Sequence, residues 1–471
     1  MISETTFLGI GLRLREFIRL NSPGALKATP LAPGAAAAAF QSLALDLFAL
    51  QYEYVPPFHR LCEARNIRPS DIRCWRDLPC VPSAALKDYD FTSLPPSERT
   101  TVFHSSGTTR QRPGRHFHSP ESLAFYEASL LPWFRGHCLP DWAGSPDTVR
   151  SVGWTTVVGL VPERAKAGLA VLSEPHTCSN APGGALGQTR PTAPECSPSR
   201  HPGGVWARSG PPALQFLSLT PSASLAPHSS LAYMVETVFR RVGGADSVFA
   251  GRVGSDGAWD LDLARAVGVL DVAVQAGLPV FLFGTAFSFV QLLDACIDGG
   301  KSWLLPRGSR VFETGGYKGR SRSMPRVEFH ALLGRVLGVA PAFVVSEYGM
   351  SELSSQAYSN VAGHPEAFGT EDDGMGRGVF SFPPWARSIV VSPETGCEAG
   401  EGETGLLRVI DLANVRSVIG IQTEDLAIRR GGGFELVGRL PYAEPRGCSL
   451  LTSASPAHES ARATLAAPHL S

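Results

Sequence analysis

Residues 104–114, His-Ser-Ser-Gly-Thr-Thr-Arg-Gln-Arg-Pro-Gly, gather hydroxyl groups, glycines and cations in one short loop after the lead-in Thr-Val-Phe. Backbone N–H groups freed by the glycines, side-chain hydroxyls and guanidinium groups can together surround a triphosphate. Flexible surface loops have the same composition, so the loop alone leaves both interpretations open. The phosphate-binding candidates are Ser105, Ser106, Gly107, Thr108 and Thr109.

A second glycine-rich cluster spans residues 312–322 and contains Gly315, Gly316, Lys318 and Arg320. The glycines would let the backbone approach a flat or charged ligand, and the cations can face phosphate or carboxylate. A basic surface hairpin has the same pattern, so this cluster alone does not decide between a binding loop and a hairpin.

Residues 346–352, Ser-Glu-Tyr-Gly-Met-Ser-Glu, follow an apolar run at 343–345. Tyr348 can lie against a purine, Ser351 can donate to an α-phosphate, and Glu352 can hold Mg²⁺, a hard cation that prefers carboxylate and phosphate oxygens. The alternative is a helix start with a capping carboxylate.

The fourth cluster combines Asp425 with a Gly-Gly-Gly turn at 431–433, a short strand at 434–437 and Arg439. A carboxylate is a suitable acceptor for the paired hydroxyls of a ribose. The same residues also fit a plain hairpin with an acidic edge.

The elements that must position these clusters alternate between strand and helix. Strands are expected at 155–160, 214–219, 280–283, 343–345 and 389–391. Helices are expected at 35–65 with a break at Pro56-Pro57, at 120–131 after the N-cap Ser119, at 261–276 and at 287–297. This order predicts an α/β fold with a largely parallel sheet. The apolar run 281–287 would serve as core or line an acyl tunnel.

The domain organisation follows from shifts in composition. We expect a helical N-terminal part at 1–100 and a core at 101–437 with a disordered insert at about 165–212, where Pro, Gly, Ser and Ala dominate. A short C-terminal segment, 438–471, would end in a frayed tail.

The charge and cysteine content narrow the class of protein. The formal net charge of −1 provides no general basic face, which argues against nucleic-acid binding. The sequence contains no run of eighteen apolar residues, so we expect no transmembrane helix. The nine cysteines form no CxxC pair and no zinc-like spacing, as is typical of reduced thiols in a cytoplasmic protein.

The succession of the four clusters resembles the adenylate-forming (AMP-binding, acyl-activating) superfamily, and within it the acyl-protein synthetase (LuxE) family. The likeness covers most of residues 40–450 apart from the insert. It is carried by residues 104–109, 313–320 (Glu-Thr-Gly-Gly-Tyr-Lys-Gly-Arg), 347–352 and 446–449 (Arg-Gly-Cys-Ser). The resemblance implies a large α/β domain with mixed or parallel sheets flanked by helices, and a truncated C-terminal subdomain.

The resemblance also implies roles for individual residues. Ser105 to Thr109 would contact the β- and γ-phosphates of ATP, and Gly315 and Gly316 would lie against adenine within the loop that also carries Lys318 and Arg320. Tyr348 would lie beside the base, Ser351 at the α-phosphate, and Glu352 would bind Mg²⁺. Asp425 would hold the ribose and Arg439 would mark the hinge. The histidines His104, His116 and His118 are expected to be supporting contacts rather than bases.

The C-terminal segment departs from the common pattern of the superfamily. Adenylate-forming ligases generally carry a lysine there that assists adenylation, but no lysine follows Lys318. Acyl-protein synthetases instead carry a cysteine that takes the acyl chain as a thioester, and Cys448 is the matching position. Its neighbours Arg446 and Gly447 would lower the thiol pKa and let the segment swing.

The expected function is therefore ATP-dependent activation of a carboxylic acid, in particular a fatty acid, to acyl-AMP, followed by transfer to Cys448. ATP and Mg²⁺ would be required, and an acyl-group reductase would be the protein partner. Two alternatives remain open at this point. One is an acid–thiol (CoA) ligase of phenylacetate-CoA ligase type, and the other is a catalytically silent nucleotide-binding scaffold.

Overall fold

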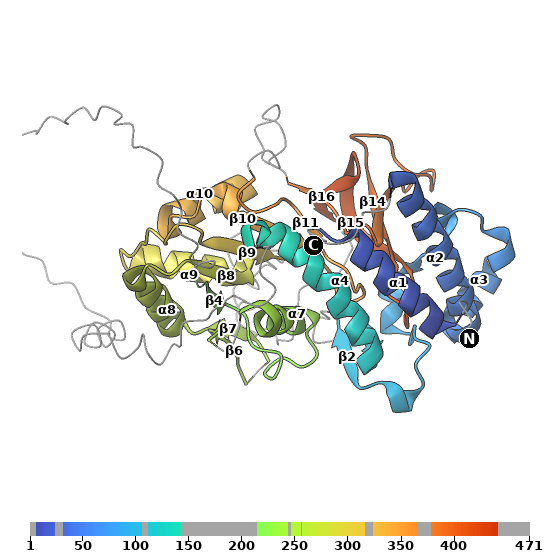
Figure 1. Ribbon diagram of the computed structural model, residues 1–471, viewed down its shortest axis with the longest axis horizontal. Helices are drawn as coiled ribbons and strands as arrows, with labels where there is room; N and C mark the ends of the chain where they lie inside the picture. The colour runs from blue at the N-terminus through green and yellow to red at the C-terminus, as the bar shows by residue number, and fades with distance from the viewer. Residues whose placement is uncertain are drawn as a thin grey trace, which may run out of the picture.

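The computed structural model describes residues 6–23, 32–105, 112–142, 214–243, 246–255, 257–315, 324–364 and 378–440. The expected strand at 155–160, the expected insert at 165–212 and the C-terminal segment from residue 441 lie outside these ranges. The described chain forms two sheets, each covered by helices, with helix α4 (Pro120–Cys138) running between the two lobes (Figure 1).

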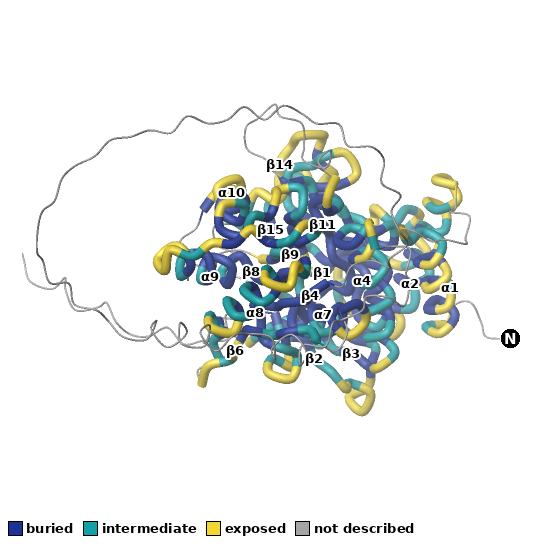
Figure 2. The backbone as a smooth tube through the Cα atoms, turned by 60° about the vertical axis from the view of Figure 1, so that its left-hand side comes forward, coloured by how far each residue is buried: buried dark blue, intermediate teal, exposed yellow. Residues whose placement is uncertain are grey.

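The first sheet has the strand order β11-β10-β9-β8-β4-β5. Its strands are β4 (Gln215–Ser218), β5 (Val248–Phe249), β8 (Val280–Thr285), β9 (Arg310–Thr314), β10 (Val344–Tyr348) and β11 (Ala357–Tyr358). All neighbours pair in parallel except β10 with β11. These parallel pairings confirm the prediction of a parallel sheet. The sequence revealed its strands because strands buried on both faces show continuous apolar runs, and Figure 2 shows the central strands buried.

Helices cover both faces of this sheet. They are α7 (Ser230–Val238), α8 (Leu263–Ala276), α9 (Ala286–Asp298) and α10 (Arg326–Leu337). Leu217, Leu282 and Val311 pack with α8, α9 and α10 on one face. Phe281 and Phe312 pack with α4 and α7 on the other. The alternation along each strand thus builds two separate cores.

The second sheet is antiparallel apart from one short parallel pairing. Its order is β12-β16-β15-β14-β13, with β1 added in parallel to β15. The strands are β1 (Val81–Pro82), β12 (Val379–Phe380), β13 (Ala386–Val391), β14 (Thr404–Asp411), β15 (Gly420–Arg430) and β16 (Gly433–Arg439). The prediction of a largely parallel sheet does not extend to this lobe, because tight turns connect β15 to β16 and leave no room for a crossover helix.

Three N-terminal helices pack against the second sheet: α1 (Phe7–Asn21), α2 (Pro33–Tyr54) and α3 (Pro56–Ala64). The expected helix break at Pro56 is confirmed. By length and composition α2 is the single candidate membrane span among the described residues. Its Leu43, Leu47 and Phe48 are buried in the core shared with the sheet.

Two small hairpins complete the described fold, formed by β2 (Thr101–His104) with β3 (Arg115–His118), and by β6 (Gly251–Val253) with β7 (Trp259–Leu261). Ser119 caps α4 as expected, accepting a bond from the Ser122 amide at 3.3 Å. The remaining short helical turns are η1 (Pro69–Asp71), η2 (Trp75–Asp77), η3 (Ser83–Lys87), η4 (Pro96–Glu98), η5 (Pro140–Trp142), η7 (Phe239–Gly243) and η8 (Pro341–Phe343). The six cysteines within the described residues are unpaired.

Candidate functional site

The candidate residues that the structure describes come from both sheets and from the β2–β3 hairpin. They are Ser105, Gly315, Tyr348, Ser351, Glu352, Asp425 and Arg439. Tyr348 ends β10 of the first sheet, and Ser351 and Glu352 follow after two intervening residues. Asp425 lies in β15 and Arg439 ends β16, both in the second sheet. The segment after β10 therefore lies where the two lobes meet.

The β2–β3 hairpin forms the stem of the loop at 104–114. The Ser105 amide donates to the Gly114 carbonyl, and the Gly114 amide donates to Ser105 Oγ, both at 2.9 Å. A Cβ atom on Gly114 would lie 2.6 Å from Ser105 Oγ and 3.6 Å from Glu352 Oε1. The stem therefore needs glycine at residue 114, and it brings Ser105 close to the carboxylate of Glu352.

Ser351 is tied to this stem by two hydrogen bonds. Its Oγ donates to the His104 carbonyl at 3.1 Å, and its own carbonyl is 2.7 Å from His116 Nδ1. Because a carbonyl oxygen only accepts, Nδ1 must carry the proton. Burial lowers the pKa of His116 to about 4, so the imidazole is neutral near pH 7. His116 thus holds the backbone at Ser351 as a neutral imidazole, and its expected role as a supporting contact rather than a base stays a prediction.

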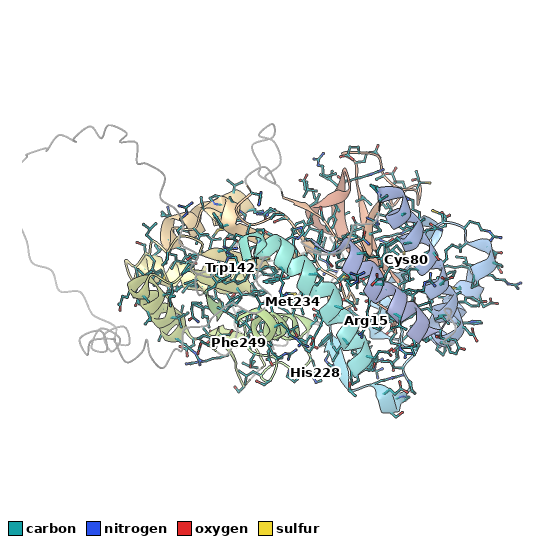
Figure 3. The ribbon with its side chains drawn as sticks, viewed as in Figure 1. Arg15, Cys80, Trp142, His228, Met234 and Phe249 are labelled. Atoms are coloured by element: carbon teal, nitrogen blue, oxygen red, sulfur yellow. The ribbon has the colours of Figure 1, made fainter. Side chains whose placement is uncertain are left out.

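His104 faces the opposite side of the hairpin from His116. Its ring stacks on His228, with centroids 4.5 Å apart, and its amide donates to the His228 carbonyl at 2.9 Å. Figure 3 shows His228 beside β2. Burial first, and then the neighbouring His228 and Arg115, lower the pKa of His104. The stem is therefore also joined to the turn that precedes α7.

Tyr348 and Asp425 are in direct contact. Tyr348 Oη donates to Asp425 Oδ2 at 2.7 Å, and the tyrosine ring packs edge-on against Phe434 at a centroid distance of 5.2 Å. Arg439 lies opposite Asp425 in the β15–β16 ladder, with Nε 3.0 Å from Oδ1. Nη2 of Arg439 donates to Glu424 Oε2 at 2.6 Å. The carboxylate of Asp425, the candidate ribose contact, thus joins Tyr348, the candidate base contact, to Arg439.

A bulge in the β15–β16 ladder sets this pairing. The register shifts between Leu426 and Ala427, so that Leu426 pairs with Gly438 while Ala427 pairs with Leu436. Val437 is the extra residue in β16, and Arg439 then falls opposite Asp425. Bulges often redirect a side chain next to a functional site.

Two acidic residues at the ends of β9 and β10 were not singled out from the sequence. The Thr314 hydroxyl donates to the Glu347 carboxyl, and burial raises the pKa of Glu347 to about 7. Burial also raises the pKa of Glu313, against the opposing effect of Arg326. The sequence feature that could have indicated Glu313 and Glu347 is an acidic residue near the carboxyl end of each of these two strands. Gly315 follows β9 with a φ of 70°, which favours glycine.

Several candidates lie outside the described ranges, and their roles remain predictions. They are Ser106, Gly107, Thr108, Thr109, Gly316, Lys318, Arg320 and Cys448. Within the described ranges no cluster of three or more His, Cys, Asp or Glu side chains could hold a metal ion. Mg²⁺ is usually held by one or two carboxylates together with substrate phosphates. The buried Glu352, 1% exposed and beside Ser105, fits that donor set.

Comparison with known proteins gave matches only among solved structures: no protein-family model and no curated protein matches the chain. One match is 2-hydroxyisobutyryl-CoA ligase in complex with 2-HIB-AMP and CoA in the thioesterification state. It is 13% identical, covering 87% of this chain and 69% of that one, with a TM-score of 0.51. The same ligase in the postadenylation state with R3-HIB-AMP matches at 13% identity over 90% and 69%, with a TM-score of 0.50. The chain therefore shares the fold of this ligase, and the predicted α/β fold class with sheets flanked by helices is confirmed.

Proposed function

We propose that this protein uses ATP to activate a carboxylic acid as an acyl-adenylate. The observation that carries the proposal is the convergence, where the two lobes meet, of three segments that lie far apart in the sequence. They supply Ser105, then Tyr348, Ser351 and Glu352, and finally Asp425. The fold is shared with a ligase whose structures contain an acyl-adenylate. The residues suit the successive parts of a nucleotide: phosphates, ribose and base.

The proposed reaction begins when a carboxylate oxygen of the substrate attacks the α-phosphorus of ATP. The bond from that phosphorus to the bridging oxygen breaks, and pyrophosphate leaves with the electron pair. Such a step depends on alignment and charge neutralisation, with no covalent group from the protein. Ser351 would donate to the α-phosphate, Ser105 would hold the terminal phosphates, and Asp425 would accept from the ribose hydroxyls. Mg²⁺, held by Glu352, would supply charge neutralisation at the phosphates.

For the second step we propose acyl transfer to the thiol of Cys448. The thiolate attacks the acyl carbonyl, AMP leaves, and a thioester forms. The support for this step is the resemblance of residues 446–449, which place a cysteine at the position where acyl-protein synthetases carry the acyl chain. A fatty acid as substrate, an acyl-group reductase as the next acceptor, and a cytoplasmic location belong to the same proposal.

A CoA ligase activity is the second candidate. The observation in its favour is that the structures with TM-scores of 0.50 and 0.51 are those of a CoA ligase. In that reaction the thiol of CoA replaces Cys448 as the attacking group and the acyl product leaves the protein.

The test incubates the full chain with ATP, Mg²⁺ and a panel of radiolabelled fatty and aromatic acids, with and without CoA. Pyrophosphate release and protein-bound label are measured together. We expect pyrophosphate release and a label that hydroxylamine removes. Cys448→Ser should lose the label and keep pyrophosphate release, whereas Cys397→Ser, at an exposed cysteine, should keep both.

Each alternative gives a distinct result. Soluble acyl-CoA without protein label would replace the acyl-protein assignment with a CoA ligase. A hydroxylamine-labile label that persists in Cys448→Ser would show that another residue carries the acyl group. No pyrophosphate release with any acid would overturn the activation step and support a silent scaffold.

A further inference from the structure

A buried carboxylate outside the four sequence clusters holds the segment that follows Tyr348. Asp411, the last residue of β14, is fully buried. Its Oδ2 accepts from the amides of Ser354 at 2.9 Å and Ser355 at 2.8 Å. Its Oδ1 accepts from Ser355 Oγ at 2.7 Å and from the Ala413 amide at 2.9 Å. Three of the four donors belong to two consecutive residues just after Glu352.

Asn414 extends the same support to Glu352 itself. Its Nδ2 donates to the Glu352 carbonyl at 3.0 Å and to the Val418 carbonyl at 3.1 Å. Its Oδ1 accepts from Ser354 Oγ at 2.8 Å. The backbone of the segment is therefore held at residue 352 by Asn414 and at residues 354 and 355 by Asp411.

A third set of contacts fixes the direction of the Ser355 hydroxyl. Trp385 Nε1 donates to Ser129 Oγ at 2.7 Å, and Ser129 Oγ is 2.8 Å from Ser355 Oγ. An indole N–H only donates, so Ser129 accepts from Trp385, and because Ser355 gives its single hydroxyl proton to Asp411, Ser129 must donate to Ser355. A directed chain of hydrogen bonds thus runs from Trp385, through α4, to the carboxylate.

Keeping the charged carboxylate of Asp411 buried costs free energy, because the carboxylate loses its contact with water. Burial raises the pKa of Asp411, and its hydrogen-bond donors only partly oppose that shift. The carboxylate links the segment after β10 to the end of β14, and β14 pairs with β15, the strand that carries Asp425. The same sheet therefore supports both the segment with Ser351 and Glu352 and the carboxylate of Asp425.

We propose that Asp411 is a positioning residue that sets the place of Ser351 and Glu352 relative to Asp425. This inference rests on the proposed function, in which these residues contact the α-phosphate, Mg²⁺ and the ribose. Asp411 touches none of these ligands itself. It acts through Ser354, Ser355 and the neighbouring Asn414.

Asparagine cannot replace Asp411 in this role. With its amide oxygen at the Oδ2 position, the NH₂ group faces the Ala413 amide. In the flipped orientation the NH₂ group faces the amides of Ser354 and Ser355. Either way a backbone N–H meets another donor and is left without an acceptor.

The test compares Asp411→Asn and Ser355→Ala with the matched control Ser309→Ala. Ser309 is also a buried serine; it accepts from the Val280 amide at 2.9 Å and donates to the Pro306 carbonyl at 2.6 Å. It precedes β9, at the end of the sheet opposite the candidate site. All variants are assayed as full chains for pyrophosphate release against Mg²⁺ and acid concentration, and for melting temperature.

We expect Ser355→Ala to lower kcat about tenfold and to raise the Mg²⁺ concentration for half-maximal rate, with little change in KM for the acid. Asp411→Asn should have a larger effect in the same direction, and Ser309→Ala should leave kcat and the Mg²⁺ dependence unchanged. Folded Asp411→Asn and Ser355→Ala proteins with the wild-type Mg²⁺ dependence and kcat would overturn the proposal. If Asp411→Asn does not fold, Ser355→Ala and Ser354→Ala carry the test.

Hydrogen exchange separates this proposal from the proposed function. The amides of Ser354 and Ser355 should exchange at least about tenfold faster in Asp411→Asn than in the wild type. If the wild type activates no acid, the proposed function fails, and faster exchange would still support the positioning of this segment by Asp411. Unchanged exchange in a folded Asp411→Asn protein would overturn the positioning itself.

Discussion

The contact between Asp425 and Arg439 allows a sharp test of ribose binding, because a second carboxylate, Glu424, serves as its control. Both carboxylates pair with Arg439, at 3.0 Å and 2.6 Å. The Asp425 side chain is 11% exposed and also accepts from Tyr348, whereas the Glu424 side chain is 32% exposed. Asp425→Asn and Glu424→Gln therefore remove similar charges at neighbouring residues with different burial.

The expected magnitude follows from the hydrogen bonds at stake. The two hydroxyls of a ribose need two acceptors, and asparagine offers one acceptor and one donor. Losing one hydrogen bond to a charged group costs about 1.5–3 kcal/mol, or about 10- to 150-fold in affinity for AMP. Glu424→Gln removes a more exposed ion pair and should cost less than about 1 kcal/mol.

The assay is calorimetric titration of AMP, 2′-deoxy-AMP and 3′-deoxy-AMP into each variant. The wild type should bind the two deoxy nucleotides more weakly than AMP, and this difference should shrink in Asp425→Asn but persist in Glu424→Gln. An Asp425→Asn protein that still discriminates against both deoxy nucleotides as the wild type does would refute the reasoning. Equal losses in the two variants would show that Arg439, rather than Asp425, determines binding.

Three further outcomes are expected. Burial lowers the pKa of His116 to about 4, so below about pH 6.5 the unfolded chain takes up a proton that the folded chain does not. The free energy of unfolding should therefore fall by up to about 3 kcal/mol as pH drops from about 6.5 to 4, and His116→Gln should lessen this fall in denaturant titrations. Glu347 has the opposite sign: with its pKa raised to about 7, the folded chain keeps a proton that the unfolded chain loses above about pH 4.5. Stability is then lost as pH rises from about 4.5 to 7, so Glu347→Gln should raise the melting temperature at pH 8 more than at pH 4, and equal shifts would contradict this. Gly114→Ala should weaken ATP binding about tenfold or more, because the new Cβ would lie 2.6 Å from Ser105 Oγ, whereas Gly268→Ala, with no atom within 4 Å, should leave binding unchanged and stabilise its helix by about 0.5–1 kcal/mol.

Three strands of the first sheet, β4, β8 and β10, could be predicted from the sequence because their burial on both faces produces continuous apolar runs, as at 280–283 and 343–345. The second sheet was harder to predict. In β15 buried and partly exposed residues alternate, and its Asp425 was interpreted as part of a site rather than as part of a long strand. Local patterns carry no information about which strands pair across the chain.

In the candidate site, too, local motifs identified single residues but not the contacts between distant ones. Tyr348 and Asp425 could be singled out from their local motifs, but the hydrogen bond between them joins residues 77 apart. Asp411 and His116 stand in no motif. Their roles come from partners 57 and 235 residues away, at Ser354 and Ser351, and only the folded chain brings these residues together.

The bulge at Val437 has a further consequence for how this site tolerates change. In an unbroken ladder Gly438 would stand opposite Asp425, and Arg439 would stand opposite Glu424 on the other face of the sheet. The bulge, by leaving Val437 out of the ladder, thus selects which of two adjacent carboxylates lies opposite the guanidinium. Val437 itself is 49% exposed. A β16 that lacked Val437 and paired without a bulge would again place the arginine opposite Asp425. The pairing therefore tolerates loss of Val437 together with the bulge, but not loss of the bulge with Val437 retained.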